Sequence, residues 1–148
     1  GGMPLGAFIA DKKIMDLLMA DPVLGHITTF GGHPVCCAAG CASMKVLLKE
    51  KLIEQIEEKE HLFCDLLKHD KIKDIRSAGL LIAVEFKNFE MVKKIIRHCI
   101  SADTNSTGVL IDWFLFAPEC LRIAPPLSIS TKTIKKASSI LLKAIDQS

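Results

Sequence analysis

No stretch of this sequence is long and apolar enough to cross a membrane, a task that needs about 20 such residues in one helix. The longest candidate, "VLIDWFLFA", is interrupted by Asp112. No charge of one sign dominates either, because the formal net charge is +2 and the basic residues are spread along the chain. A protein that binds nucleic acid or a membrane surface concentrates lysine and arginine on one face. We therefore expect neither of these as a partner.

Familiar catalytic signatures are missing as well. The sequence contains no Ser-His-Asp order, no paired-carboxylate signature and no Walker phosphate loop. It also shows no signal-peptide pattern, and its core is expected to hold without disulfides. We therefore expect reduced thiols in a cytoplasmic protein. The six cysteines are Cys36, Cys37, Cys41, Cys64, Cys99 and Cys120.

What the sequence does contain is enough apolar material for a globular core. Hydrophobic residues make up 49% of its 148 residues and charged residues 24%, which excludes a disordered chain. From residue 34 onward, the patterns predict a long helix, two strands, a helix, two strands and a final helix. This order indicates an α+β fold in which helices back a small sheet. Residues 1–33 do not belong naturally to that layer, and we interpret them as the tail of a larger domain.

Local signals place the predicted elements. A short buried strand is expected at Gly6–Ala10, and Asp11 can cap the helix that follows. Pro34 suits the first position of a small-residue helix, with a bend expected near residues 49–51. Further on, residues 117–119 are expected to separate two strands, "VLIDWF" and "CLRIAP", and Ser130 or Thr131 to cap the last helix.

Arg122, in "CLRIAPP", is one of three chemical features. Strand alternation places Leu121 and Ile123 on one face and Arg122 on the other, away from the core. A rigid strand that ends in a double proline would hold the guanidinium well for two-pronged binding of a carboxylate. The alternative is a surface arginine paired with Glu85 or Glu119, and the strand pattern alone favours this alternative.

The second feature is "TTFGG", which precedes the helix at Pro34. The hydroxyls of Thr28 and Thr29, the glycine N–H groups and a helix N-terminus together suit a phosphate. A plain capping loop with permissive glycines explains the same residues equally well.

The third feature is the spacing of His33, Cys37 and Cys41, which could bring three zinc ligands to one helix face. A fourth ligand is not evident, and cysteines alternating with alanines are typical of helix packing. We therefore expect no metal.

Together these stretches resemble the C-terminal portion of the class III pyridoxal-phosphate aminotransferases, the group of the ornithine, acetylornithine and 4-aminobutyrate enzymes. The resemblance spans almost the whole chain, and the motifs occur in the family's order and at about its spacing. They are "GGMPLGAFIA", "HITTFGGHPVCCAAGCA", "IRSAGLLIAVEF" and "GVLIDWFLFAPECLRIAPPLSIS".

The resemblance implies specific roles for several residues. It also favours a carboxylate-binding Arg122 over the surface arginine that the strand pattern alone favoured. It implies that Thr29, with Thr28 beside it, binds the cofactor phosphate of the neighbouring subunit in a homodimer. It implies that Arg122 holds the substrate carboxylate. The implied reaction transfers an amino group from an amino acid to a 2-oxo acid on pyridoxal 5'-phosphate. The implied fold is the small C-terminal domain of a fold-type I enzyme, with a largely antiparallel sheet.

The resemblance also implies that this chain lacks a catalytic group. The family's Schiff-base lysine lies a few residues before the glycine pair that matches Gly1-Gly2, and Lys12 and Lys13 lie on the wrong side of that pair. We therefore expect a piece of a longer enzyme: residues 1–33 from the large cofactor-binding domain, and residues 34–148 as a linking helix and small domain. Such a piece is expected to be inactive and not to hold the cofactor.

Two further expectations follow. Without the larger domain, residues 1–32 and the helix of residues 34–48 should expose apolar side chains, and the same would hold for the alternative of a free-standing cytoplasmic interaction module. The segment before Arg122 varies in the family and approaches its active site. Its Trp113, Phe114 and Phe116 are either an apolar pocket wall or ordinary strand packing, and both remain open.

Overall fold

The computed structural model describes residues 2–19, 21–23, 25–100 and 107–148. The chain divides into two compact units, Gly1–Lys51 and Leu52–Ser148, and each is described by itself. The polar stretch "SADTNSTG" predicts a loop over residues 101–108, of which residues 101–106 lie outside the described residues. The boundary predicted at residue 33 concerns the domains of a larger enzyme and stays a prediction.

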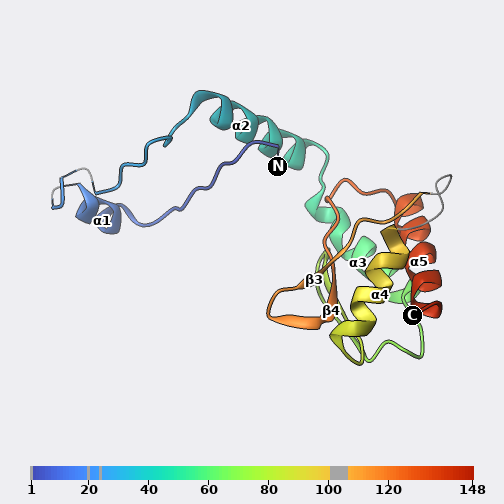
Figure 1. Cartoon of the computed structure of the whole chain (residues 1–148). Helices are drawn as coiled ribbons and strands as arrows, with labels where there is room; N and C mark the ends of the chain where they lie inside the picture. Colours follow the sequence, from blue (N-terminus) through green and yellow to red (C-terminus); the bar gives the residue numbers. More distant parts are fainter. Residues whose placement is uncertain (1, 20, 24, 101–106) are drawn as a thin grey trace. The chain divides into compact units, whose positions relative to one another are not determined.

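The first unit contains α1 (Lys12–Met15), η1 (Asp16–Leu18) and α2 (Pro34–Lys49) (Figure 1). Both predicted helix starts are confirmed in position, because Asp11 is the N-cap residue of α1 and Pro34 opens α2. The Asp11 carbonyl accepts the first helical bonds, but its side chain makes no capping hydrogen bond. The strand predicted at Gly6–Ala10 is wrong: this segment is irregular. Among the described residues of this unit there is no strand to pair with it, and an unpaired strand leaves its ladder groups unsatisfied.

The first unit exposes many apolar side chains. No residue of α2 is buried, and Ile9 is 98% exposed. A small-residue helix with cysteine and alanine along it is typical of close packing against another element. The predicted exposure of residues 1–32 and of the helix after them is therefore confirmed. Large apolar side chains exposed in this unit include Leu5, Phe8, Leu17, Met19, Val23, Phe30, Val35, Met44 and Leu48.

The second unit contains a four-stranded sheet and three longer helices. The strands lie in the order β1-β2-β4-β3, and each neighbouring pair is antiparallel. This confirms the predicted α+β class and the predicted order of elements. The elements are η2 (Ile53–Gln55), α3 (Ile56–Leu66), β1 (Asp74–Ala78), β2 (Leu81–Glu85), α4 (Phe89–Ile100), β3 (Asp112–Phe114), β4 (Ala117–Ile123) and α5 (Thr131–Asp146).

The core of this unit forms where the inner face of the sheet meets the helices. Strand alternation directs Ile82 and Val84 of β2, and Leu121 and Ile123 of β4, toward this face. Figure 1 shows α4 and α5 side by side, and both α3 and α4 pack against α5. Core residues from the helices are Phe63, Val92, Ile95, Ile96, Cys99, Ile134, Leu141, Ala144 and Ile145. Helical spacing predicts that Val92, Ile95, Ile96, Cys99 and Ile100 share the inward face of α4, and this is confirmed except for Ile100, which is 53% exposed.

The predicted bend near residues 49–51 is confirmed. Helix α2 ends at Lys49, and Lys51 adopts a positive φ of 51°. A residue with a side chain rarely adopts this left-handed conformation, so the helix cannot continue through it.

The β3–β4 hairpin differs from the prediction. Residues 117–119 were expected to separate the strands, but they belong to β4, and the turn lies at Leu115 and Phe116. Pro118 is tolerated because β4 pairs with β2 only from Cys120 to Ile123, so the strand lacks no ladder donor there. A register shift follows Trp113, where Phe114 pairs with Ala117. This bulge separates the turn from the regular part of the sheet.

Two tight corners explain local sequence choices. Gly79 turns the β1–β2 hairpin with a φ of +62°, and a Cβ there would lie 2.8 Å from Ile56 Cγ2. Glycine is therefore required both by conformation and by space. Ser130 caps α5, because its hydroxyl accepts the Thr133 N–H at 3.1 Å. Of the two residues predicted as the cap, Ser130 and Thr131, the first is therefore confirmed.

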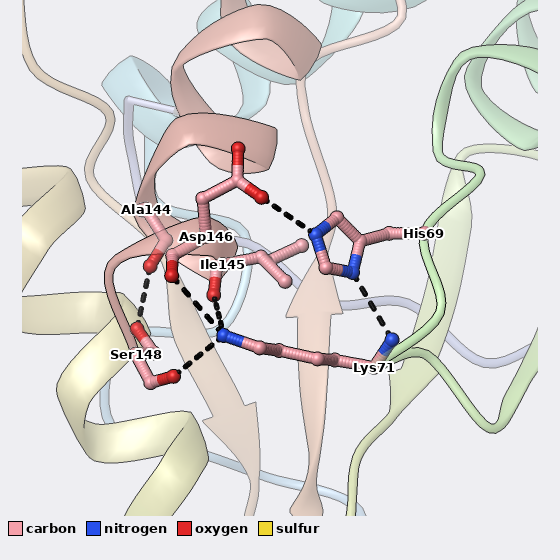
Figure 2. A network of polar contacts seen from close by, with 6 residues as sticks. All are labelled: His69, Lys71, Ala144, Ile145, Asp146 and Ser148. Carbon is pink, nitrogen blue, oxygen red and sulfur yellow. Dashed lines mark hydrogen bonds and ion pairs between the residues drawn. The ribbon is translucent and has the colours of Figure 1, made fainter.

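Two lysines that the sequence pattern did not single out bind backbone carbonyls and so fix the positions of α3 and α5. Lys59, which is buried on α3, donates to the Leu127 carbonyl at 2.7 Å. Lys71 donates to the carbonyls of Ile145, Asp146 and Ser148 at 3.0, 3.1 and 2.7 Å, as Figure 2 shows. These carbonyls lie at the C-terminal end of α5, where a cation offsets the helix dipole and satisfies unpaired acceptors.

His69 joins the same corner (Figure 2). Its Nδ1 accepts the Lys71 backbone N–H at 3.0 Å, so the proton of the neutral ring lies on Nε2, which donates to Asp146 Oδ1 at 2.9 Å. The segment between α3 and β1 is thereby tied to the end of α5.

Shortening Leu121 tests the assignment of the core. Leu121→Ala should lower the free energy of unfolding by about 2–5 kcal/mol, because it opens a cavity beneath a fully buried side chain. Urea unfolding followed by the fluorescence of Trp113, the chain's one tryptophan, measures this. Leu110→Ala, at a side chain that is 91% exposed, is the control and should change stability by less than about 0.5 kcal/mol. Equal losses in both variants would contradict the assignment.

Candidate functional site

The outer face of the sheet carries a row of charged residues. Register places Asp112 of β3 opposite Arg122 of β4, Arg122 opposite Ala83 of β2, and Ala83 opposite Arg76 of β1. The side chain of Arg122 is 45% exposed, whereas Leu121 is fully buried and Ile123 nearly so. The predicted direction of Arg122, away from the core, is therefore confirmed.

Arg122 pairs with a residue that the sequence did not indicate. Its Nη2 donates to Asp112 Oδ2 at 3.2 Å, rather than to Glu85 or Glu119. Among the described residues, Asp112 is its one ion-pair partner. A charge that interrupts the apolar run "VLIDWFLFA" was a usable signal, but only the strand register shows which residue it faces.

Arg76 is the second arginine of this face and is more fully engaged. Its Nη1 donates to Asp74 at 2.8 Å and to Glu85 at 2.7 Å, and its Nη2 contacts Cys120 Sγ at 3.3 Å. The hydrogen bonds to Glu85 and Asp74 raise the pKa of Arg76 above its already high usual value. Two carboxylates thus surround Arg76, whereas Arg122 has one and keeps donors for a ligand.

An open hollow of about 450 Å³ lies between the two arginines. Its wall is largely apolar and comes from the hairpin tip and from β4. The lining includes Arg76, Arg122, Cys120, Phe114, Leu115 and Phe116.

The three hairpin aromatics divide between the two uses that the sequence left open. Phe114 and Phe116 line the hollow, as a pocket wall would. Trp113 instead packs on Phe89 of α4, with ring centroids 5.2 Å apart. Alternation explains the division, since neighbouring strand residues point to opposite faces.

The loop before α2 presents hydroxyls and backbone N–H groups. Thr28 and Thr29 are both exposed. The turn closes when Gly31 N–H donates to the Thr28 carbonyl at 3.1 Å. A Cβ on Gly31 would lie 2.7 Å from Thr28 Oγ1, so the threonine hydroxyl occupies the space that a side chain would take. Exposed threonines ahead of a 16-residue helix are groups of the kind that can bind one side of a phosphate.

Zinc finds no support in the structure. Within residues 2–19, 21–23, 25–100 and 107–148, no group of three or more histidine, cysteine or acidic side chains is placed to hold a metal ion. His33, Cys37 and Cys41 therefore do not form the site that their spacing allowed. No described helix is long and apolar enough to span a membrane.

The second unit is an α+β domain whose antiparallel sheet exposes Arg122 on its outer face. The family model of the class-III aminotransferases matches residues 1–145, and the chain belongs to that family.

Solved structures of the family share the fold. An ornithine aminotransferase from Plasmodium yoelii is 26% identical with a TM-score of 0.77, and the match covers 94% of this chain and 36% of that one. An ornithine aminotransferase from Toxoplasma gondii is 28% identical with a TM-score of 0.75, over 90% and 31%. An aminotransferase from Bacillus anthracis is 25% identical with a TM-score of 0.73, over 85% and 31%. The chain thus spans about a third of the length of these enzymes.

Thiol reactivity should follow burial. Burial raises the pKa of Cys99 from 9.0 to about 11, and burial also raises the pKa of Cys120. The thiols of Cys37 and Cys41 belong to exposed residues. At pH 8 we expect iodoacetamide to modify Cys37 and Cys41 quickly, and Cys99 only after denaturation, since the thiolate is the reactive form. Mass spectrometry of the peptides measures this, with urea-unfolded chain as the control.

The same shift predicts how stability depends on pH. A raised pKa means that the folded state holds the Cys99 proton more tightly than the unfolded state. Its contribution to stability is fully present below about pH 9 and is lost as the pH rises to about 11. Modification of Cys99 in the folded chain at pH 8, at the rate of Cys37, would contradict the burial that both statements use.

Proposed function

We propose that this chain is the C-terminal third of a pyridoxal-phosphate-dependent aminotransferase. The whole enzyme transfers an amino group from an amino acid of the ornithine, acetylornithine or omega-amino class to a 2-oxo acid. The observation that carries the proposal is Arg122, which stands exposed on a rigid strand with one counter-ion. It occupies the position where the family resemblance expects the carboxylate-binding arginine.

Arg122 holds the substrate carboxylate in this proposal. A guanidinium can bind both oxygens of a carboxylate through parallel N–H bonds, which fixes orientation as well as position. Strand β4 is paired on both sides, with β2 and with β3. The cation is therefore held by the sheet rather than by a mobile loop, and a substrate bound to it is aligned before it reacts.

Thr29, with Thr28 beside it, holds the cofactor phosphate. When bound, pyridoxal phosphate supplies the electron sink for the reaction. The threonine hydroxyls donate hydrogen bonds to the phosphate oxygens and keep the group in place. The family resemblance assigns this contact to the neighbouring subunit, so the whole enzyme is proposed to be a homodimer, in the cytoplasm.

The 148 residues alone are proposed to be inactive. The family's Schiff-base lysine would lie before Gly1, and Lys12 and Lys13 follow the matching glycine pair instead. The coverage of about a third of each matched enzyme supports this proposal. The exposed apolar side chains of the first unit would pack against the remaining two thirds. A free-standing interaction module would also use them, but the family match favours the enzyme.

Replacing Arg122 tests the proposal. In the full-length protein supplied with cofactor, Arg122→Lys should lower kcat/KM for amino transfer to a 2-oxo acid about 10- to 100-fold, because lysine keeps the charge and loses the two-pronged contact. Arg97→Lys, on the exposed face of α4, is the matched control and should leave kcat/KM unchanged. A full-length protein without any amino transfer, or an Arg122→Lys variant as active as the wild type, would contradict the proposal.

Replacing Thr29 tests the cofactor contact. Thr29→Val has nearly the same shape without the hydroxyl, so the Kd for pyridoxal phosphate should rise on the order of tenfold. Equilibrium dialysis of the full-length protein measures this. Thr131→Val, at an exposed threonine of α5, is the control. An unchanged Kd in Thr29→Val would remove Thr29 from the phosphate site.

A further inference from the structure

A second cavity, of about 360 Å³, lies within the second unit on the helix side of the sheet. We call it the α5 pocket, because residues of α5 form one wall of it. Phe63 of α3, residues 108–111 and residues 122–126 form most of the remaining wall. Its volume lies within the range of small-molecule sites, roughly 300–1,000 Å³. The α5 pocket is therefore large enough to hold an organic molecule.

The turn after β4 gives the α5 pocket a fixed wall. Pro126 and Ile129 line the pocket, and the Ile129 N–H donates to the Pro126 carbonyl at 3.0 Å. Between them, the Leu127 carbonyl accepts from Lys59 Nζ of α3 at 2.7 Å. These two bonds hold the turn in place, and a largely pre-formed wall is typical of small-molecule sites.

Ser138 of α5 brings a buried hydroxyl to this pocket. The residue lines the pocket and is 2% exposed. Its Oγ is buried and has no hydrogen-bond partner among the described residues. A serine within a helix can donate to the carbonyl one turn earlier, but Ser138 makes no such bond. A buried hydroxyl without a partner costs free energy, so Ser138 is a hydrogen-bonding group that the fold itself does not use.

The other polar side chains of the wall are already engaged. The Thr133 hydroxyl lies 2.8 Å from Ser130 Oγ, within the cap of α5. Arg122 is the one charged residue among the described lining residues, and its side chain lies on the outer face of the sheet, where it pairs with Asp112. Ser138 is therefore the polar side chain that the α5 pocket can offer to a ligand.

The rest of the wall is largely apolar. A charged ligand would lose its water there without gaining a counter-charge, which is costly. A bound water needs about two to four polar partners, so an apolar pocket suits water poorly. An apolar ring or chain, in contrast, gains free energy by leaving water. The chemistry of the wall thus favours an uncharged, mainly apolar occupant.

We infer that the α5 pocket binds a small uncharged molecule that has an apolar body and one hydrogen-bonding group, which meets Ser138 Oγ. This site goes beyond the proposed function and does not rest on it. It uses the helix side of the sheet, whereas Arg122 points away from the outer face, and it stands whether or not the whole enzyme transfers amino groups.

Two probes that differ by one hydroxyl, 2-naphthol and naphthalene, test the site. Calorimetry at pH 7, where both probes are uncharged, measures their binding to the full-length protein. Both should bind, and Ser138→Ala should raise the Kd of 2-naphthol roughly two- to tenfold, the loss expected for one neutral hydrogen bond. The Kd of naphthalene should stay the same or fall. Ser139→Ala, at the exposed neighbour on α5, is the control and should change neither Kd.

Filling the α5 pocket tests where the probes bind. Ala137→Leu places a larger side chain in the wall formed by α5 and should abolish the binding of both probes. Ala124→Leu does the same from the segment after β4 and serves as a second variant, with circular dichroism to show that each is folded. A folded variant of either kind that still binds both probes as the wild type does would overturn the site.

The stability of Ser138→Ala without any probe gives an independent readout. Removal of a buried hydroxyl that has no partner should leave the midpoint of urea unfolding unchanged or raise it. A lower midpoint would show that the hydroxyl has a partner within the protein, and this would overturn the inference. So would a wild-type protein that binds neither probe, or an equal effect of Ser138→Ala on the two probes.

Discussion

The alternation of side chains along β2 and β4 is the constraint on which the second unit depends. Ile82, Val84, Leu121 and Ile123 must face the helices, because each fully buried aliphatic side chain contributes about 1.5–3 kcal/mol by leaving water. Once these positions are fixed, the residues between them have no choice of face. The packing that stabilises the domain is therefore also what displays Arg122, and no separate device is needed to aim it.

The parts of the fold that depend on local signals were predictable from sequence. The Pro34 start, the Ser130 cap, the helix faces and the outward direction of Arg122 each follow from a few neighbouring residues. Gly6–Ala10 failed because a strand exists only with a partner, which an apolar run cannot supply alone. The hairpin turn was misplaced because Pro118 is a strong breaker in general, yet is harmless where a strand end is unpaired.

The candidate site shows the same limit more sharply. Arg122 could be found from sequence, whereas its partner Asp112 could not, since ten positions separate them and only the register brings them opposite each other. Alternation turns Trp113 toward Phe89 and Phe114 toward the hollow, but the letters "DWFLF" do not show which face of the sheet carries the hollow. The prediction of a phosphate site at Thr28 and Thr29 rests on a local pattern, because the hydroxyls and glycines are neighbours in the sequence before a helix; it stays a prediction.

The hairpin tip contributes little to the core, because Leu115 is 78% exposed and Phe116 is 97% exposed. The bulge insulates it from the paired strands that carry the cation. Leu115 and Phe116 can therefore be substituted, or the turn lengthened, without disturbing the core of the domain or the position of Arg122. Substitutions at the hairpin tip can therefore change the lining of the hollow beside Arg122 without changing the paired strands that support it.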